Sequence, residues 1–252
     1  MDFGIKGKRA LVFGGSSGLG LAICDALAAE GVNLVIFARN SERLAAAKLQ
    51  LTQRHAVTVE TFAGNMTSAE EVQTLASHLR ASGGLDILVL NSGRPPSPMR
   101  ELLEEDEPAR WEEAYRQQLD AVLIGILSIV PLLVDRGWGR VIGITSATVK
   151  QPMPKHAISS VFRAGVQAAL KHLSNEVAAR GVTVNTVAPA GILTEGLAKF
   201  HDLSKRAEAI PTQRLGTQEE FAATVAFLAS RQAGFINGQA IQVDGGMTQS
   251  LV

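Results

Sequence analysis

Glycines and serines follow a short apolar run near the start of the chain, in a spacing that suits anion binding. The run Ala10–Phe13 leads into Gly14-Gly15-Ser16-Ser17-Gly18-Leu19-Gly20, where an amphipathic segment begins. Glycines allow a tight turn and let a pyrophosphate approach a helix N-terminus, where unpaired N–H groups and the helix dipole favour negative charge. The pattern predicts a phosphate-binding turn, and the alternative is a tight strand-to-helix turn that binds nothing. The residues expected in it are Gly14, Ser16, Ser17, Gly18, Leu19 and Gly20.

The spacing Gly14-x-x-x-Gly18-x-Gly20 resembles the cofactor turn of the short-chain dehydrogenase/reductase family, and the resemblance extends over nearly the whole chain. Asn91-Ser92-Gly93 is similar to the family's Asn-Ala-Gly motif. Further similar segments are Val182–Asn185 with Pro189 and Thr194, Asn237-Gly238-Gln239, and Val243-Asp244-Gly245-Gly246.

The resemblance implies a Rossmann domain that holds a nicotinamide dinucleotide and no metal. It adds a set of cofactor-binding residues to the glycine turn: Asn65, Met66, Asn91, Ser92, Gly93, Arg163, Pro189, Ile192 and Thr194.

The end of the second predicted strand bears on the choice of dinucleotide. An acidic residue there would bind a ribose 2′-hydroxyl, and a cation would accept a 2′-phosphate. The stretch reads Phe37-Ala38-Arg39-Asn40. With no carboxylate present, Arg39 favours NADP(H) over NAD(H), and a solvated surface arginine is the competing interpretation. Asn65 falls where the family usually keeps an Asp beside the adenine, and its amide can still form hydrogen bonds.

The resemblance also implies a proton relay of four residues. In the family a Tyr exchanges a proton with the substrate oxygen, a Lys four residues later lowers the phenol's pKa and holds the ribose, a Ser steers the carbonyl and an Asn positions a water. Spacing places the Ser role at Ser146, and the Tyr, Lys and Asn roles at Ser159, Arg163 and Gln118. The chain is therefore expected to be an atypical member that lacks the Tyr-x-x-x-Lys pair.

These exchanges change the chemistry that the site can perform. Ser159 and Arg163 stand four apart on a predicted helix and can share one face. A serine hydroxyl is a much weaker acid than a phenol, and Arg stays protonated, so Ser159 is a poor proton donor. Arg163 can still bind ribose hydroxyls or a substrate carboxylate through its planar fork.

Other side chains are candidates for the missing proton donor. His156, one turn before the predicted Tyr position, is the first, and Lys150 and Lys155 are next, because these residue types can exchange a proton near neutral pH when suitably buried. The alternative is that all three are exposed polar side chains. Tyr115, the only tyrosine, lies near the start of a long predicted helix, and His201 is a weaker candidate on a later insertion.

Short, nearly continuous apolar runs alternate with helical patterns along the whole chain. Such runs are typical of parallel strands covered on both faces, so we expect an α/β fold, a three-layer doubly wound parallel sheet of about seven strands in a single domain over residues 1–252. The predicted strands are Ala10–Phe13, Asn33–Ala38, Val57–Phe62, Asp86–Leu90, Arg140–Thr145, Val182–Ala188 and Ala240–Val243, and the predicted helices are Leu19–Glu30, Glu42–Gln53, Ala69–Ala81, Trp111–Val134, Ile158–Arg180 and Glu219–Ser230.

Two long connections interrupt the alternation. Arg94–Pro108 holds four of the nine prolines and an acidic cluster, and Gly191–Gly216 is an insertion with both signs of charge. Long connections at strand ends often carry sites, so we interpret the second as a lid. Two solvated loops are the alternative.

Composition narrows the class of protein. The 24 Lys+Arg balance the 24 Asp+Glu, which argues against nucleic acid as a partner. The single Cys24 excludes an internal disulfide and a cysteine metal cluster, which fits a cytoplasmic protein. Met1–Lys8 lacks the apolar core of a signal peptide, and the apolar run Ala121–Val134 is too short to span a membrane.

Three functions remain open. The leading hypothesis is an NADP-dependent oxidoreductase that acts on a small carbonyl or alcohol, with an altered proton path. A catalytically impaired, dinucleotide-binding regulatory protein is the second, and a non-redox dehydratase or isomerase on the same fold is the third. The resemblance further implies a homodimer or homotetramer.

Overall fold

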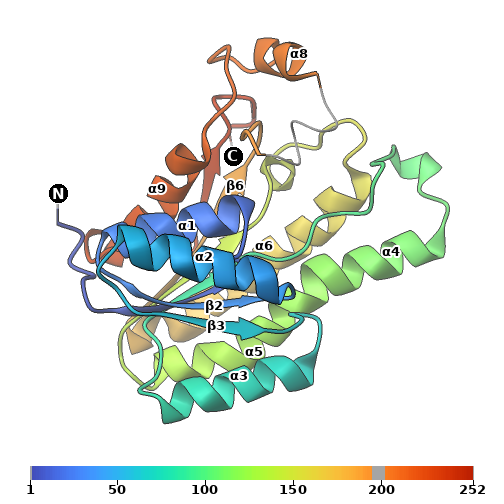
Figure 1. The fold of residues 1–252 in the computed structure, drawn as a ribbon. Coiled ribbons are helices and arrows are strands. Elements are labelled where there is room, and N and C mark those ends of the chain that lie inside the picture. The colour runs from blue at the N-terminus through green and yellow to red at the C-terminus, as the bar shows by residue number, and fades with distance from the viewer. Residues whose placement is uncertain (1, 195–201, 252) are drawn as a thin grey trace.

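Seven parallel strands form one sheet in the order β3-β2-β1-β4-β5-β6-β7, with helices on both of its faces (Figure 1). This computed structural model describes residues 2–194 and 202–251. The doubly wound fold is confirmed, and each strand end lies within two residues of its predicted position. The strands are β1 (Arg9–Phe13), β2 (Asn33–Ala38), β3 (Val59–Ala63), β4 (Ile87–Leu90), β5 (Gly139–Ile144), β6 (Val182–Pro189) and β7 (Ala240–Val243).

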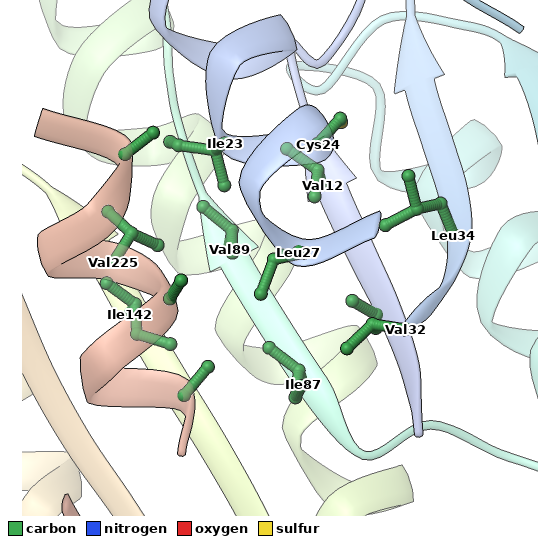
Figure 2. Close-up of a cluster of buried hydrophobic side chains, with 14 of the residues drawn as sticks. Val12, Ile23, Cys24, Leu27, Val32, Leu34, Ile87, Val89, Ile142 and Val225 are labelled. Atoms are coloured by element: carbon green, nitrogen blue, oxygen red, sulfur yellow. The ribbon is translucent and has the colours of Figure 1, made fainter. Parts of the chain in front are cut away.

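The sheet separates two apolar clusters, because its central strands are buried on both sides. Cys24, Leu27 and Val225 from the helices of one face gather with Val12 and Val89 from the strands (Figure 2). Alternate residues of the same strands face the second cluster. The helices on the first face are α1 (Gly18–Ala29), α2 (Ser41–Arg54) and α9 (Gln218–Ala229), and those on the second are α3 (Ala69–Ala81), α5 (Ala121–Val134) and α6 (Ala157–Val177).

The order of the strands places the switch point of the sheet, where open α/β folds form their binding crevice, beside β1. Val12 of β1 pairs with Ile36 of β2 on one side and with Val89 of β4 on the other. The chain therefore changes its direction of progress across the sheet at this point, and open α/β sheets bind ligands outside the carboxyl ends of the strands there. The loops that follow β1, β4, β5 and β6 all leave from this edge.

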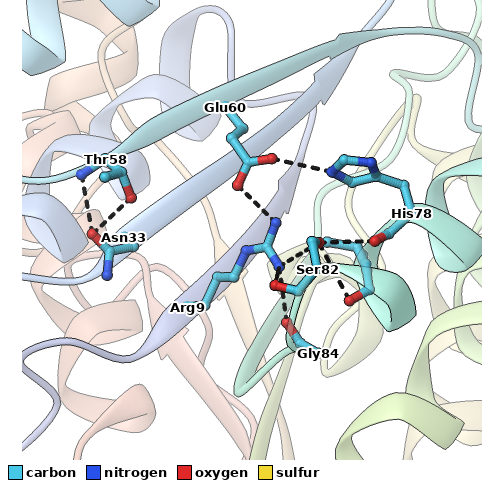
Figure 3. Close-up of polar contacts among 8 residues, drawn as sticks. Arg9, Asn33, Thr58, Glu60, His78, Ser82 and Gly84 are labelled. Carbon is cyan, nitrogen blue, oxygen red and sulfur yellow. Dashed lines mark hydrogen bonds and ion pairs between the residues drawn. The ribbon is translucent and has the colours of Figure 1, made fainter.

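Charged and polar contacts join the amino ends of the strands, on the side of the sheet away from these loops (Figure 3). Arg9 Nη2 lies 2.7 Å from Glu60 Oε1, and His78 Nε2 lies 3.2 Å from the other oxygen of Glu60. Arg9 also donates to Ser82 Oγ at 2.9 Å and to the Gly84 carbonyl at 3.3 Å. One guanidinium thus joins β1, β3 and the connection from α3 to β4.

The long helix predicted over Trp111–Val134 differs from the structure in two ways. It begins earlier, at Pro108, because proline is well suited to the first turn of a helix, where its missing N–H needs no partner. It is also divided into α4 (Pro108–Ala114), a π-helical turn (Tyr115–Asp120) and α5. Apolar periodicity does not reveal a π turn, because the turn adds one residue without changing the residue types.

This helix, Pro108–Val134, is long and apolar enough by composition to cross a membrane. Half of its most apolar stretch is buried in the protein, and Val122 and Ile129 of α5 belong to the cluster beneath the sheet. We therefore interpret it as a core helix.

The C-terminal part of the predicted helix Ile158–Arg180 also differs. The α-helix α6 ends at Val177, and a 3₁₀ turn continues to Arg180. Gly181 then takes φ +74°, which ends the helix before β6.

The connection Arg94–Pro108 is anchored by one buried ion pair. Arg110 Nε and Nη2 lie 2.7 and 2.9 Å from the two carboxylate oxygens of Glu105, whose side chain is 2% exposed. Arg110 also donates to the Pro98 carbonyl at 2.6 Å, and Trp111 Nε1 donates to the Glu105 carbonyl at 2.7 Å. These contacts fix the loop against the start of α4.

The insertion Gly191–Gly216 is joined at its base by a bridge between Ile192 and Gly216. It carries the short helix α8 (Leu203–Glu208), which was not predicted and which lies at the top of Figure 1. The candidate His201 lies outside the described residues.

We predict that Glu105→Gln lowers the free energy of unfolding at pH 7 by about 3 kcal/mol, because it leaves the Arg110 guanidinium without its carboxylate. The bond to Arg110 lowers the pKa of Glu105 in the folded state. The stabilisation is therefore present above the unfolded pKa of about 4.3 and is lost as the pH falls through the lower folded value. Urea unfolding at pH 7 and pH 3 measures both effects.

The matched control is Glu107→Gln, since the Glu107 side chain is 56% exposed and pairs with Arg100 at the surface. We expect its effect to stay below about 0.5 kcal/mol. Equal effects of the two substitutions at pH 7 would contradict the assignment of the anchor to Glu105.

Candidate active site

The turn after β1 depends on two glycines that touch. A Cβ at Gly20 would lie 2.1 Å from the Gly14 carbonyl oxygen, so no side chain fits there. Gly14 has φ +65°, which side-chain-bearing residues rarely adopt. Gly18 has φ +53° with open space around its missing Cβ. The turn therefore presents bare backbone to the crevice at the start of α1.

The N-terminus of α1 differs from those of α2, α3 and α9. Its N-cap residue Ser17 makes no side-chain cap bond, and its first turn contains no acidic residue. In the other three helices the caps Asn40, Ser68 and Thr217 accept a backbone N–H, and each first turn holds at least one Glu. Only α1 among these four thus keeps its first N–H groups and its dipole available to an anion. Ser16, Ser17 and Leu19 lie partly or fully exposed beside them.

The neighbouring cofactor candidates follow directly on the carboxyl ends of β2, β3 and β4. Asn91, at the end of β4, places its Nδ2 3.5 Å from the Gly14 carbonyl. Asn65 uses its Oδ1 to accept the Thr67 N–H at 3.2 Å, which leaves its amide N–H groups for a ligand. Met66 packs against the apolar cluster beneath the sheet. Arg39 is exposed, and its side chain has no hydrogen bond or ion pair with the residues that the structure describes.

Arg163 is buried, and its guanidinium donates three hydrogen bonds to other residues of the protein. Nη1 donates to Ser92 Oγ at 2.8 Å and to the Ile144 carbonyl at 3.1 Å, and Nη2 donates to the Gly93 carbonyl at 2.6 Å. It has no carboxylate partner within residues 2–194 and 202–251. Burial lowers the pKa of the guanidinium to about 10, so it stays charged at neutral pH.

Gln118 lies in the π turn and is fully buried. Its backbone carbonyl accepts the Ser92 hydroxyl at 3.2 Å, but neither atom of its side-chain amide has a partner among the described residues. A buried amide without a hydrogen bond lowers the stability of the fold, so packing alone does not explain a glutamine at position 118.

A cavity of about 440 Å³ opens beside the ends of β5 and β6. It brings together three predicted residues, Ser146, His156 and Pro189. Ser146 Oγ accepts the Thr148 N–H at 3.3 Å. His156 Nδ1 lies 2.7 Å from the Pro154 carbonyl, which can only accept, so Nδ1 carries the proton and Nε2 is left for another partner.

Several cavity residues were not predicted as site residues. Arg206 comes from α8, and burial lowers the pKa of its guanidinium. Its only sequence signal is a charge in the insertion, which holds both signs. Met247 reaches the cavity only because the chain folds back after β7, and no local pattern shows this. The other newly found lining residues are Gln151, Pro152, Met153, Pro154, Ala190, Gly191 and Ala209.

The remaining candidates do not line the cavity. Ser159 is 6% exposed, and its hydroxyl forms no hydrogen bond with the described residues. Lys150 and Lys155 are exposed, as their alternative interpretation expected. Tyr115 is 42% exposed and lies against the Phe162 ring, at 6.2 Å between centroids.

Two members of the predicted nicotinamide loop, Ile192 and Thr194, lie just beyond β6. Ile192 is 7% exposed and packs in the apolar cluster shared with α9, while Thr194 is partly buried.

An uncapped helix at the switch point of a doubly wound sheet, with a cavity beside the next strand ends, is the arrangement in which open α/β proteins bind their ligands. The chain belongs to the short-chain dehydrogenase/reductase family. A family model described as enoyl-(acyl carrier protein) reductase matches residues 14–248.

Individual relatives agree with this assignment. Nodulation protein G of Rhizobium sp. is 34% identical over 248 residues, which cover 97% of this chain and 98% of that protein. The 3-oxoacyl-(acyl-carrier-protein) reductase FabG of Staphylococcus epidermidis is 34% identical over 245 residues, 95% of this chain and 98% of that one. The crystal structure of L-sorbose reductase from Gluconobacter frateurii, complexed with NADPH and L-sorbose, superposes with a TM-score of 0.92 at 33% identity and full coverage of both chains.

We predict that Gln118→Met raises the free energy of unfolding by about 1 kcal/mol, because it removes a buried amide that has no partner while keeping a similar volume. Chemical denaturation measures the change. Gln73→Met, on an exposed position of α3, serves as the control and should change little. A loss of stability on Gln118→Met would mean that the amide has a partner in solution.

Proposed function

We propose that the chain is an NADP-dependent oxidoreductase of the short-chain dehydrogenase/reductase type that acts on a small carbonyl or alcohol through an altered proton path. The observation that carries the proposal is the free N-terminus of α1 at the switch point, with Ser146 and His156 together in the adjacent cavity. The NADPH complex of the sorbose reductase relative supports the same cofactor.

The residues present fit this dinucleotide. The bare turn Gly14–Gly20 would hold the pyrophosphate against the N–H groups of α1. The exposed Arg39 would accept the 2′-phosphate, and Asn65 and Asn91 would bind on the adenosine side. When bound, the cofactor supplies or accepts a hydride. The chain's own task is then to orient the reacting carbon and to move one proton.

Ser146 and His156 are the residues that we assign to the reacting oxygen. Ser146 Oγ would donate a hydrogen bond to it, since this hydroxyl accepts from Thr148 and keeps its own proton for a ligand. His156 Nε2 would exchange the proton, because Nδ1 is fixed by the Pro154 carbonyl. The burial of Ser159 outside the cavity supports an atypical site in which this serine does not replace the family's Tyr.

A dinucleotide-binding regulatory protein is the second candidate. It is favoured by the contacts of Arg163 with Ser92, Gly93 and Ile144. These contacts hold strand ends together and occupy guanidinium N–H groups that a substrate would otherwise use. Oxidation of NADPH by any carbonyl substrate separates the two candidates.

We further propose one domain over residues 1–252, a cytoplasmic location and a homo-oligomer. Leu127 of α5 and Val161 of α6 are 76% and 50% exposed, which supports a subunit contact on these helices.

We predict that Arg39→Ala weakens NADPH binding about tenfold, equivalent to about 1.4 kcal/mol, and leaves NADH binding within twofold. Only NADPH carries the phosphate that Arg39 would neutralise. Titration followed by nicotinamide fluorescence measures both constants. Arg80→Ala, an exposed arginine on α3, is the control and should change neither constant. Equal losses for the two nucleotides would remove Arg39 from the 2′-phosphate site.

We predict that His156→Gln lowers kcat at least tenfold on a carbonyl substrate found by screening NADPH oxidation, and leaves the NADPH dissociation constant unchanged. Glutamine keeps a polar side chain but cannot exchange the proton. Ser146→Ala should lower kcat in the same way, whereas Lys150→Gln and Lys155→Gln should not. Unchanged turnover in the His156 and Ser146 variants would refute their roles.

A further inference from the structure

We propose that Ser92 is a positioning residue, which holds the buried guanidinium of Arg163 at the carboxyl edge of the sheet in the orientation that dinucleotide binding requires. This inference rests on the proposed function, and it assigns to Ser92 a task that its place in the Asn91-Ser92-Gly93 motif does not by itself indicate.

The Ser92 hydroxyl is engaged on both sides. It accepts from Arg163 Nη1 at 2.8 Å and donates to the Gln118 carbonyl at 3.2 Å. The next residue, Gly93, receives Arg163 Nη2 on its carbonyl at 2.6 Å and gives its N–H to the Gln117 carbonyl at 3.0 Å. Two consecutive residues after β4 thus connect the guanidinium to the π turn.

This network joins three elements around one charge. The acceptors of Arg163 come from the loop after β4 and, through Ile144, from the end of β5, and the π turn is reached through Ser92. All are neutral groups, so the charge is stabilised by oriented dipoles and not by a carboxylate in the described chain. Such a charge depends on the geometry of every dipole around it.

A hydroxyl is needed at position 92 because it can accept and donate at once. An alanine there would leave Arg163 Nη1 with the Ile144 carbonyl alone and would remove the hydroxyl that donates to the Gln118 carbonyl. Arg163 would then be held by the Gly93 and Ile144 carbonyls alone, so the orientation of its guanidinium would be less well fixed. Ser92 also follows directly on Asn91, whose amide lies 3.5 Å from the Gly14 carbonyl of the phosphate turn. A shift in the guanidinium is therefore transmitted to the crevice.

The experiment compares Ser92→Ala with the conservative Ser92→Thr, which keeps the hydroxyl. The control is Ser77→Ala, because Ser77 is an exposed serine of α3 whose hydroxyl donates only to the Gln73 carbonyl at 2.9 Å. Two quantities are measured: the NADPH dissociation constant by fluorescence titration, and amide hydrogen exchange of the segment 115–120 in the protein without ligand.

We expect Ser92→Ala to weaken NADPH binding at least tenfold and to speed exchange of the segment 115–120 at least tenfold. Ser92→Thr should restore both quantities to within threefold of the unmodified chain, and Ser77→Ala should change neither.

Faster exchange with an unchanged NADPH constant would show a purely structural contact and would overturn the proposal, as would failure of Ser92→Thr to restore binding. Unchanged values of both quantities in Ser92→Ala would do the same while leaving the proposed function intact. If the unmodified chain binds neither NADPH nor NADH, the proposed function fails, and the ligand-directed role of Ser92 fails with it.

Discussion

The contact between Gly20 and the Gly14 carbonyl is the constraint on which the rest of the site depends. With no Cβ at Gly20, the first turn of α1 lies directly against the end of β1. The same Gly14 carbonyl lies 3.5 Å from the Asn91 amide, and the close approach lets Cys24 and Leu27 of α1 enter the apolar cluster with β1 and β4. Binding geometry and core packing on this face thus follow from one close backbone contact.

The charged side chains at the amino ends and at the carboxyl ends of the strands are stabilised in different ways. At the amino edge, Arg9 meets Glu60 and Lys8 meets Asp86, so cations are paired with carboxylates. At the carboxyl edge, Arg163 is held by a hydroxyl and by carbonyls, and α1 has no capping side chain. Paired charges favour stability, whereas oriented dipoles and unpaired donors prepare a surface for a ligand that brings negative charge. The uncapped N-terminus of α1 and the carboxylate-free Arg163 thus both lie at the carboxyl ends of the strands, where the loop after β4 keeps a buried pair of its own, Glu105 with Arg110.

Sequence reasoning was sufficient for the fold and for the glycine turn that links β1 to α1. Buried parallel strands are continuous apolar runs, which a sequence shows directly. The spacing of the glycines likewise predicts where the backbone packs closely or takes a positive φ. The strand β3 was predicted two residues early at its start and one residue early at its end, because Val57 and Thr58 already alternate as a strand does. What could not be predicted depends on distant parts of the chain meeting. The partners of Arg163 come from β4 and β5, and Met247 reaches the cavity only through the return of the chain after β7.

The reactivity of Cys24 reports on the contact between α1 and the glycine turn. The Cys24 thiol is fully buried beneath the glycine turn, 3.7 Å from the Gly15 carbonyl, and burial raises its pKa far above the usual range of a thiol. Reaction with a thiol reagent therefore requires α1 to separate from the turn. Because the chain contains no other cysteine, the rate of that reaction measures how often α1 separates from the glycine turn. A ligand that holds the turn closed would lower the rate in proportion to the fraction of protein that it occupies.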